Sequence, residues 1–369
     1  MESMHNELNN IIQAFGIKGD LVDIKQNTDG HINSTFVSVF DNDGKIEKYT
    51  HQRINKDVFP SPEKVMDNIV KVTDYISKQI DSKDKERLVL KVINALDKRP
   101  YYVDQKGEYW RCYRYIDNAV AFSKCTSLML AKNLAIAIGD FHLKLSGFDG
   151  SLLFPSIKDF HNMVMRYDAL SKAVEQDRMA RAKGVRYELG FLFDNMQRGE
   201  KIWKDYENGL LPNRVTHNDT KINNVLFDKD SMKPLAVIDL DTIMPGTILF
   251  DIGDMIRTSC NSADEDERNL GKVEFNVSIY EALIYGYLSK TGRFLKEPEL
   301  SGILESGRMM TQIMAVRFLT DYLDGDRYYR ISYPEHNLIR ARNQIKLISS
   351  MDKIWSKLDG MTAKMIQSR

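Results

Sequence analysis

One short stretch of the chain constrains its fold and its chemistry more than any other. In the segment VTHNDTKINNVLF, His217, Asp219 and Asn224 form an H-x-D-x-x-x-x-N pattern in a polar loop that leads into an apolar run. A second apolar run, LAVI, ends at Asp239. The separation accommodates a strand, a turn over residues 228–234 and a second strand. The pattern therefore predicts a β-hairpin that follows a polar loop.

This set of residues suits the transfer of a phosphoryl group to a hydroxyl. The reaction needs a carboxylate that orients the hydroxyl and accepts its proton, and an amide and a carboxylate that hold Mg²⁺. Mg²⁺ prefers oxygen ligands and keeps several of its waters, so two protein ligands suffice. We therefore assign Asp219 as the catalytic base and Asn224 and Asp239 as metal ligands. Each element alone arises often by chance, whereas the combined spacing rarely does.

The same residues carry a family resemblance. HNDTKINN followed by VIDLDTIMPG resembles the aminoglycoside-phosphotransferase-like kinases, which share the catalytic layout of protein kinases. Outside this core, the segments Asp29–Asn33, His51–Pro60 and Arg317–Asp326, with Tyr328, resemble the N-acetylhexosamine 1-kinases. The resemblance covers nearly the whole chain. It implies ATP and Mg²⁺ as cofactors and a sugar acceptor phosphorylated at its anomeric C1 hydroxyl.

The order of predicted elements agrees with a bilobal, protein-kinase-like α+β fold. One helical pattern, Pro62–Ile80, interrupts a series of strand-like segments, with Ser61 as its N-cap, and helical patterns dominate from about Ser123. We expect a nucleotide-binding lobe over residues 1–116, and a C-terminal lobe over 117–369 with the catalytic loop, the metal site and the acceptor pocket. The strand-like segments are 21–24, 35–40, 49–54, 88–93 and 109–116.

Composition excludes several other classes of function. The chain of 369 residues has 52 basic and 52 acidic side chains, so nothing indicates nucleic acid or an anionic membrane surface as a partner. Cys112, Cys125 and Cys260 lack metal-ligand or redox spacing, which suits a reducing compartment. The first residues are too polar for a secretory signal, and no apolar run has membrane-spanning length. We therefore expect a cytoplasmic protein; the sequence does not indicate its oligomeric state.

The resemblance places a phosphate-covering turn near the start of the chain. Asp29, Gly30, His31 and Asn33 are expected there, with backbone N–H groups over the phosphates of ATP and His31 also facing the sugar. The segment has one glycine where protein kinases have G-x-G-x-x-G. Considered alone, it is typical of a hairpin turn.

The strand after this turn departs from the usual kinase pattern. Kinases place a lysine there against the α and β phosphates, and Arg53 is the nearest cation in this chain. Arginine keeps the charge and adds bidentate geometry, and the alternative is an arginine at the surface. Tyr115 and Ile116 lie where fold analogy predicts the hinge, whose backbone would bind an adenine edge.

Three residues near the catalytic loop receive supporting or shared roles. Asp241 follows Asp239 by two positions, so it is expected to be a second ligand, a sugar contact or a turn carboxylate. His217 is expected to brace the loop. The resemblance assigns Asp251 to hydrogen bonds with the loop, and the alternative is a helix N-cap. Lys221 either neutralises the transferring phosphoryl group or faces solvent.

The acceptor side is assigned to a helical pattern over residues 308–323. Arg317 lies there on an otherwise apolar face, and its five donors suit sugar hydroxyls or an acetamido carbonyl. The alternative is an ion pair with Asp321 at the i+4 position. The resemblance favours Arg317 and Tyr328 as substrate contacts, with Trp355 as a stacking surface for a sugar ring.

The identity of the acceptor follows from charge and from the resemblance. A polycationic aminoglycoside needs a carboxylate-rich pocket, and the one acidic run, residues 264–267, is expected to be a solvated loop. This favours N-acetylglucosamine or N-acetylgalactosamine. The alternatives are a kinase for an aminoglycoside, choline or homoserine, and a nucleotide-binding regulator that lacks transfer activity. A protein kinase is disfavoured because no activation segment is evident.

Overall fold

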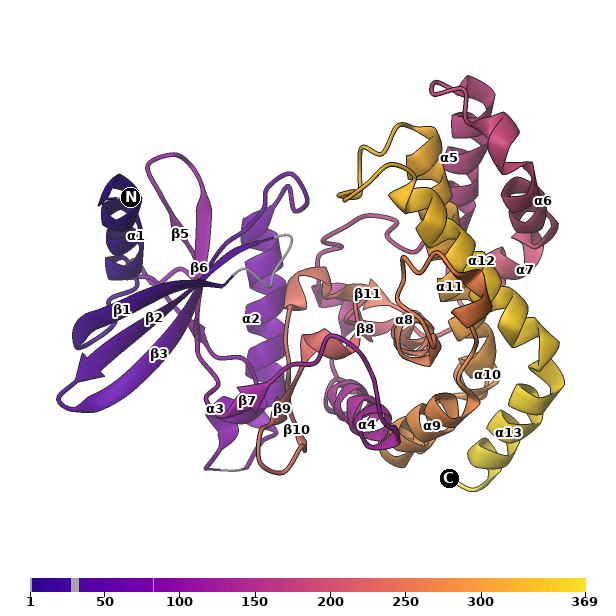
Figure 1. Cartoon of the computed structure of the whole chain (residues 1–369). Coiled ribbons are helices and arrows are strands. Elements are labelled where there is room, and N and C mark those ends of the chain that lie inside the picture. Colours follow the sequence, from indigo (N-terminus) through magenta and orange to yellow (C-terminus); the bar gives the residue numbers. More distant parts are fainter. Residues whose placement is uncertain (1, 28–32, 82) are drawn as a thin grey trace. The chain divides into compact units, whose positions relative to one another are not determined.

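The computed structural model describes residues 2–27, 33–81 and 83–369, which form two compact units. We call them the sheet unit and the helical unit (Figure 1). The expected α+β class is confirmed. Each unit combines segments that are distant from one another in the sequence. The hairpin after the catalytic loop therefore belongs to the sheet unit. The sheet unit comprises Met1–Val120, Leu152–Ile157 and Leu226–Met244, and the helical unit comprises Ala121–Ser151, Lys158–Val225 and Pro245–Arg369.

The sheet unit contains an antiparallel sheet (Figure 1). Its strands run in the order β1-β2-β3-β6-β4, and β5 also pairs with β6. Gln52 pairs with Arg111, and His51 pairs with Cys112, so these two pairs face opposite sides of the sheet. The strands are β1 (Asp20–Asn27), β2 (Ser34–Asn42), β3 (Lys45–Arg53), β4 (Val92–Ile93), β5 (Tyr102–Val103) and β6 (Tyr109–Arg114).

The core of the sheet unit lies on the face that carries His51. Helix α1 (Glu2–Gln13) covers this face, and Phe15, just after the helix, contacts the His51 ring at 5.6 Å between centroids. Burial lowers the pKa of His51 to about 4, so its ring is neutral and bonds Ser38 Oγ at 2.8 Å. The other main members of this core are Leu8, Ile11, Ile12, Phe40, Tyr49 and Trp110.

Helix α2 (Pro62–Lys78) follows the predicted pattern closely. It begins with Pro62 after the N-cap Ser61, whose side chain makes no capping hydrogen bond. The fixed φ of proline suits this first position. One expected strand was wrong in extent: residues 85–88 form a helical turn, α3 (Lys85–Leu88), and only Val92–Ile93 pairs as β4. The expected strand covered residues 88–93, so Leu88 lies in the helical turn and residues 89–91 lie outside any strand.

The predicted hairpin after the catalytic loop is confirmed. Strands β9 (Val225–Asp228) and β10 (Pro234–Val237) pair, and β7 (Ala119–Val120) joins the outer side of β9. A short 3₁₀ turn, η4 (Leu240–Thr242), follows β10 directly. Residue 239 therefore lies between the hairpin and the turn, as the N-cap of η4.

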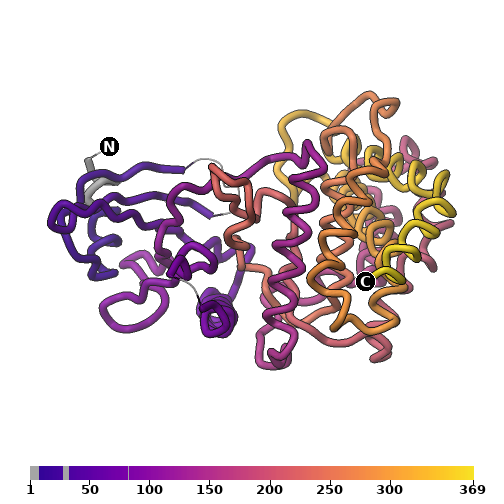
Figure 2. The backbone as a smooth tube through the Cα atoms, turned by 90° about the horizontal axis from the view of Figure 1, so that it is seen from below, coloured from indigo at the N-terminus to yellow at the C-terminus, as the bar shows by residue number. Residues whose placement is uncertain are grey.

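Helices form nearly all of the helical unit, and α4 runs alongside α9 (Figure 2). A Cβ added to Gly286 of α9 would lie 2.5 Å from the backbone oxygen of Lys132, so glycine permits this close packing. The helices are α4 (Leu128–Lys144), α5 (Met163–Gln176), α6 (Arg186–Asp194), α7 (Met196–Glu207), α8 (Ile248–Cys260), α9 (Val277–Thr291), α10 (Glu297–Ser301), α11 (Ile303–Leu323), α12 (His336–Lys353) and α13 (Trp355–Gln367). Short elements are η1 (Gly150–Leu152), η2 (Ala182–Val185), η3 (Ile222–Asn224), η5 (Leu270–Lys272), β8 (Arg214–Thr216) and β11 (Met244–Gly246), which pairs with β8.

Helix α11 lies at the centre of the helical unit. It packs against α5, α7, α8 and α12, so most of its residues are buried. The sequence indicated one apolar face for this helix, but α11 is buried on several faces because other helices surround it. Within the described part of the chain, no helix has the length and apolar character needed to cross a membrane.

Phe15→Ala tests the packing of α1 on the sheet. Removing a ring that is 3% exposed is expected to lower the free energy of unfolding by about 3–5 kcal/mol. Urea denaturation followed by circular dichroism measures it. Val22→Ala, at a side chain 61% exposed, is the control and is expected to change stability by less than about 0.5 kcal/mol. Equal effects of the two substitutions would contradict this packing.

Candidate active site

The predicted catalytic loop lies between β8 and η3, and its polar side chains contact one another. The Asn224 side-chain amide donates to Asp219 Oδ2 and to its backbone oxygen, both at 2.8 Å. The Lys221 ammonium lies 2.8 Å from Asp219 Oδ2. The Asp219 N–H donates to His217 Nδ1 at 3.2 Å. The structure thus brings together His217, Asp219 and Asn224, as the spacing predicted, and adds Lys221.

The surroundings of Asp219 keep its half-buried carboxylate ionised. Burial pushes the pKa of Asp219 upward, but the Lys221 ammonium, His217 and the Asn224 amide outweigh it. The pKa of Asp219 therefore lies below its ordinary value. An ionised carboxylate at this position can accept a hydrogen bond and a proton from a hydroxyl.

Asp251 anchors the catalytic loop to helix α8. Its carboxylate is fully buried and accepts the backbone N–H groups of His217 at 2.7 Å and Asn218 at 2.6 Å. His142 Nε2 on α4 bonds Asp251 Oδ2 at 2.8 Å. Burial acts to raise the pKa of Asp251, but His142, His217 and the loop N–H group keep it below the ordinary value. Thr247, and not Asp251, is the N-cap of α8.

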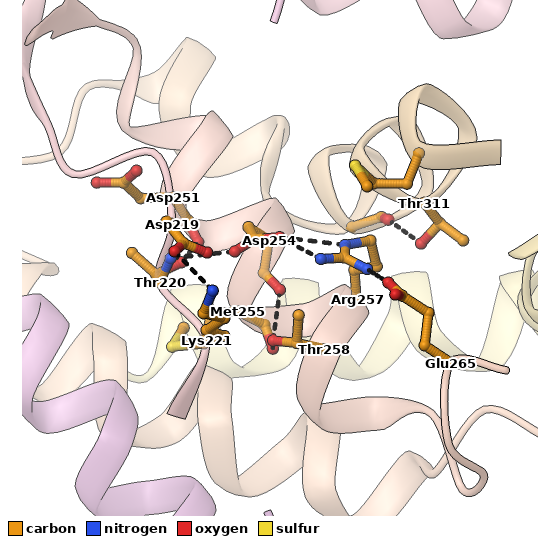
Figure 3. A network of polar contacts seen from close by, with 12 residues as sticks. Asp219, Thr220, Lys221, Asp251, Asp254, Met255, Arg257, Thr258, Glu265 and Thr311 are labelled. Atoms are coloured by element: carbon orange, nitrogen blue, oxygen red, sulfur yellow. Dashed lines mark hydrogen bonds and ion pairs between the residues drawn. The ribbon is translucent and has the colours of Figure 1, made fainter. Parts of the chain in front are cut away.

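A second buried carboxylate, Asp254, lies one helical turn beyond Asp251. Figure 3 shows Asp254 directed toward Thr220 on one side and Arg257 on the other. Asp254 Oδ2 accepts the Thr220 N–H at 3.0 Å, and Oδ1 accepts from Arg257 at 2.9 Å. Burial raises the pKa of Asp254, the charge of Asp219 adds to this effect, and Arg257 opposes it. Sequence reasoning missed this residue, although its position three residues after Asp251 places both on one helix face.

The acidic run at residues 264–267 is solvated only in part: Asp264 is exposed, as expected, whereas the other three residues are partly buried. Glu265 bridges Arg257 and Arg340, and the pairs hold the loop against α8 and α12. Arg257 lies only eight residues before Glu265, whereas Arg340 lies 75 residues after it, too far for the sequence to reveal this partner. The other pairs are Asp264 with Lys124 at 3.0 Å, Asp266 with Tyr333 Oη at 3.2 Å, and Glu267 with Lys272 at 3.2 Å.

The predicted metal ligand Asp239 lies in the sheet unit. It is exposed and adopts a left-handed backbone conformation, with φ of +59°, at the start of η4. Asp241, two residues later, is buried, and its carboxylate accepts from both Arg111 nitrogens Nη1 and Nη2 and from Asn33 Nδ2 at 2.7 Å. Among the residues that the structure describes, no three His, Cys, Asp or Glu side chains are grouped to hold a metal ion. The metal ligands stay a prediction.

The other nucleotide-side predictions have mixed placements. Asp29, Gly30 and His31 lie outside the described residues. Arg53 is exposed at the end of β3, on the His51 side of the sheet, and its Nη2 lies 3.4 Å from Ser34 Oγ. The structure therefore does not bring Arg53 next to Arg111.

At the predicted hinge, the backbone is partly engaged. The Tyr115 N–H donates to the backbone oxygen of Lys48 at 3.0 Å, and the Lys48 ammonium lies over the Tyr115 ring. Ile116 is buried. An adenine edge at this point would have to use other backbone groups.

Arg317 on α11 is surrounded by aromatic rings. Its guanidinium lies over the rings of Phe160, Tyr328 and Tyr329, at 5.1, 5.7 and 5.5 Å from their centroids. No ion pair with Asp321 forms among the described side chains. Asp321 instead accepts the backbone N–H groups of residues 327–329, at 2.8–2.9 Å. The ion-pair alternative is wrong because this loop occupies the carboxylate.

The structure does not bring Trp355 together with Arg317. The Arg198 guanidinium lies 4.1 Å from the centroid of the indole of Trp355, and Arg198 pairs with Glu305 at 2.9 Å. Glu305 is near the start of α11, whereas Arg317 lies about 18 Å farther along it at 1.5 Å per residue. No contact of Trp355 with Arg317 or Tyr328 supports its predicted role of stacking on a sugar ring.

A comparison with known protein families identifies the family of this chain. The chain matches the phosphotransferase enzyme family (APH) over residues 73–283, more than half its length, and it belongs to that family. This confirms the expected class, a kinase of the small-molecule type, but not the acceptor.

Solved structures share the fold at low identity. A microcompartment-associated aminopropanol kinase has a TM-score of 0.64 and 14% identity, with 96% of this chain and 98% of that chain covered. Spectinomycin phosphotransferase, solved with ADP and spectinomycin, has a TM-score of 0.57 and 13% identity, with 94% and 98% covered. Choline kinase from Cryptosporidium parvum has a TM-score of 0.53 and 14% identity, with 92% and 91% covered.

Asp251→Asn tests the anchor of the catalytic loop. An amide offers one acceptor oxygen to the donors that the carboxylate now serves, so we expect a loss of about 3–5 kcal/mol in the free energy of unfolding at pH 7. Asp205→Asn breaks an exposed pair with Lys201 on α7 and is the control, with an expected loss of at most about 1 kcal/mol. Guanidinium denaturation measures both.

The stability difference between the wild type and Asp251→Asn is expected to depend on pH. The folded-state pKa of Asp251 lies below its unfolded value of about 3.9. Its ionised form therefore contributes stability above that value, and this contribution is lost as the pH falls through the folded-state pKa. The difference between wild type and Asp251→Asn should narrow below about pH 4. A difference that stays constant down to pH 3 would contradict a stabilising carboxylate.

Proposed function

We propose that this protein is an ATP- and Mg²⁺-dependent kinase that phosphorylates the anomeric C1 hydroxyl of N-acetylhexosamines. The observation that carries the proposal is the Asp219 carboxylate, half-buried, ionised and held between Asn224 and Lys221 on a loop that Asp251 anchors. Membership in the phosphotransferase enzyme family supports it, and a related structure was solved with ADP. The acceptor rests on the resemblance to N-acetylhexosamine 1-kinases.

In this mechanism Asp219 orients the acceptor hydroxyl and takes its proton. The hydroxyl oxygen bonds to the γ-phosphorus of ATP while the bond from that phosphorus to the bridging oxygen breaks, and ADP leaves. Lys221, 2.8 Å from Asp219, is placed to pair with negative charge on the transferred group. Positioning and electrostatics account for most of the catalysis, and no covalent enzyme intermediate is needed.

The residues assigned to Mg²⁺ fit its chemistry. Asn224 uses its amide nitrogen on Asp219, which leaves the carbonyl oxygen as the part suited to a cation, and Asp239 supplies an exposed carboxylate. Both are hard oxygen donors of the kind Mg²⁺ accepts beside phosphate oxygens and water. When bound, the metal neutralises the charge that develops on the phosphates.

The charges near Arg317 favour an acceptor without a positive charge. Among the described residues Arg317 has no carboxylate partner, and Arg166 and His161 are close enough to interact with it electrostatically. Each acidic side chain of the run 264–267 has a partner within the protein, so the run offers little to an amine. A guanidinium among aromatic rings suits a hydroxyl or an acetamido oxygen.

A second candidate is a kinase for a small amino alcohol. The similarity to an aminopropanol kinase, which covers nearly all of both chains, favours it. ADP release is measured with Mg²⁺ and N-acetylglucosamine, N-acetylgalactosamine, glucose, aminopropanol, choline or spectinomycin as acceptor. We expect turnover with the N-acetylhexosamines. Turnover only with an amine would replace the proposed acceptor, and ATP binding without any turnover would favour a nucleotide-binding regulator.

Asp219→Asn tests the proposed base. The amide keeps the shape but accepts no proton, so kcat is expected to fall by at least about 100-fold, with ATP affinity nearly unchanged. Coupled ADP-release kinetics and isothermal titration with ATP measure the two quantities. Asp205→Asn is the control and should keep the wild-type kcat. A kcat near the wild-type value in Asp219→Asn would remove it as the base.

Arg317→Ala tests the acceptor contact. Loss of a charged hydrogen bond of about 1.5–3 kcal/mol predicts a rise of about 10- to 100-fold in the acceptor KM, with the ATP KM changed less than about twofold. Arg198→Ala removes a similar guanidinium–ring contact, with Trp355, and should leave the acceptor KM unchanged. An unchanged KM with lowered stability in Arg317→Ala would indicate a structural role only. A raised KM in Arg198→Ala would return Trp355 to the acceptor site.

A further inference from the structure

A buried ion pair connects the sheet to the turn that carries Asp239. Arg111 on β6 is 1% exposed, and Asp241 is 3% exposed. Two guanidinium nitrogens of Arg111 bond the two carboxylate oxygens, and its Nε donates to Gln52 Oε1 at 2.9 Å. A buried charge is tolerated only with such complete pairing, so neither partner can leave this arrangement without exposing the other.

A buried asparagine on α2 holds the same turn two residues later. Asn68 is 1% exposed, and its Nδ2 donates to the backbone oxygens of Ile243 at 2.9 Å and Phe154 at 2.7 Å. Its Oδ1 accepts the Phe154 N–H at 2.9 Å. Every hydrogen-bonding group of this amide side chain is therefore used to fix backbone. These hydrogen bonds explain why the polar residue Asn68 is buried on the apolar face of α2.

Just before the two anchored positions, Asp239 has a backbone conformation that non-glycine residues seldom adopt. Its φ is +59° and its ψ is +55°. Such a conformation persists only where the surrounding structure enforces it. The enforcing contacts are those of Asp241 with Arg111 and of Ile243 with Asn68. The Ile243 N–H, bonded to the Leu240 oxygen at 3.2 Å, closes the turn.

The turn is also tied to the chain that precedes β2. Asn33 Nδ2 donates to Asp241 Oδ2 at 2.7 Å, and Asn33 Oδ1 accepts the Asn55 N–H at 3.0 Å. Asn33 is the last of the residues expected to cover the phosphates. Asp241 is therefore the shared acceptor of a sheet cation and of this segment.

We infer that Arg111 and Asn68 are positioning residues that hold the 239–243 turn so that Asp239 is presented to the metal. Arg111 acts through Asp241, and Asn68 acts through the backbone oxygen of Ile243. Neither residue touches the reacting atoms. The inference rests on the proposed assignment of Asp239 as a metal ligand.

Arg111→Met and Arg111→Lys test the inference through hydrogen exchange and the Mg²⁺ requirement. Without any ligand, the amide of Ile243 in Arg111→Met is expected to exchange at least tenfold faster than in the wild type. The Mg²⁺ concentration for half-maximal ADP release is expected to rise at least tenfold, with the acceptor KM nearly unchanged. Arg111→Lys should recover part of both effects, because an ammonium keeps the charge but cannot bond both carboxylate oxygens and Gln52.

Arg214→Met is the matched control. It breaks the buried pair between Arg214 and Glu299 in the helical unit, so it lowers stability without touching the turn. Wild-type exchange at Ile243 and a wild-type Mg²⁺ requirement are expected. If Arg214→Met changes both as much as Arg111→Met, general destabilisation explains the effect and the inference is overturned.

A milder variant keeps the test decisive if Arg111→Met does not fold. Asn68→Ala removes the second anchor and is expected to accelerate exchange at Ile243 in the same way. Unchanged exchange in this variant, or in a folded Arg111→Met, would overturn the inference. Hydrogen exchange at Ile243 can be measured without any enzyme turnover. If the wild type were inactive, the proposed function would be rejected, but the exchange measurement would still test the anchoring of the turn.

Discussion

The buried carboxylate of Asp251 is the contact on which the catalytic loop depends. It accepts two consecutive backbone N–H groups, from His217 and Asn218, and so fixes the path of the chain immediately before Asp219. His142, held in turn by Tyr287, supplies a third donor from another helix. An anionic acceptor with full hydrogen bonding is stable when buried, whereas an unpaired one is not. These hydrogen bonds therefore attach the loop to helix α8 and, through His142 and Tyr287, to helices α4 and α9.

Buried charges are used in the same way throughout the molecule. The chain has equal numbers of acidic and basic residues, and a few of them form pairs that are buried inside the structure. Arg111 with Asp241 organises a turn in the sheet unit, and Arg257 with Asp254 and Glu265 organises the acidic run in the helical unit. Arg317 differs because aromatic rings surround it and no carboxylate in the described part of the chain pairs with it. This difference is why we connect Arg317 with an acceptor.

The sequence predicted what depends on short spacing. The contacts among His217, Asp219 and Asn224, the hairpin that follows them and helix α2 all follow from residues close together in the chain. Long-range partners were beyond reach: Arg111 and Asp241 are 130 residues apart, and His142 and Asp251 are 109 apart. Glu265 also pairs with Arg340, 75 residues away, so the sequence did not show that the acidic run is only partly solvated. The helix α11 was expected to show one apolar face because its sequence does not reveal how many helices pack around it.

The central claim is that this chain transfers a phosphoryl group to an anomeric hydroxyl. The most direct measurement incubates the protein with ATP, Mg²⁺ and N-acetylglucosamine labelled with ¹³C at C1, and records the phosphorus NMR spectrum of the product. The account predicts a new phosphate signal split by coupling to the labelled carbon, and its absence from the Asp219→Asn variant. A product phosphate without that coupling would place the phosphate on another hydroxyl and contradict the proposed regiochemistry. Absence of any sugar phosphate would contradict the proposed acceptor.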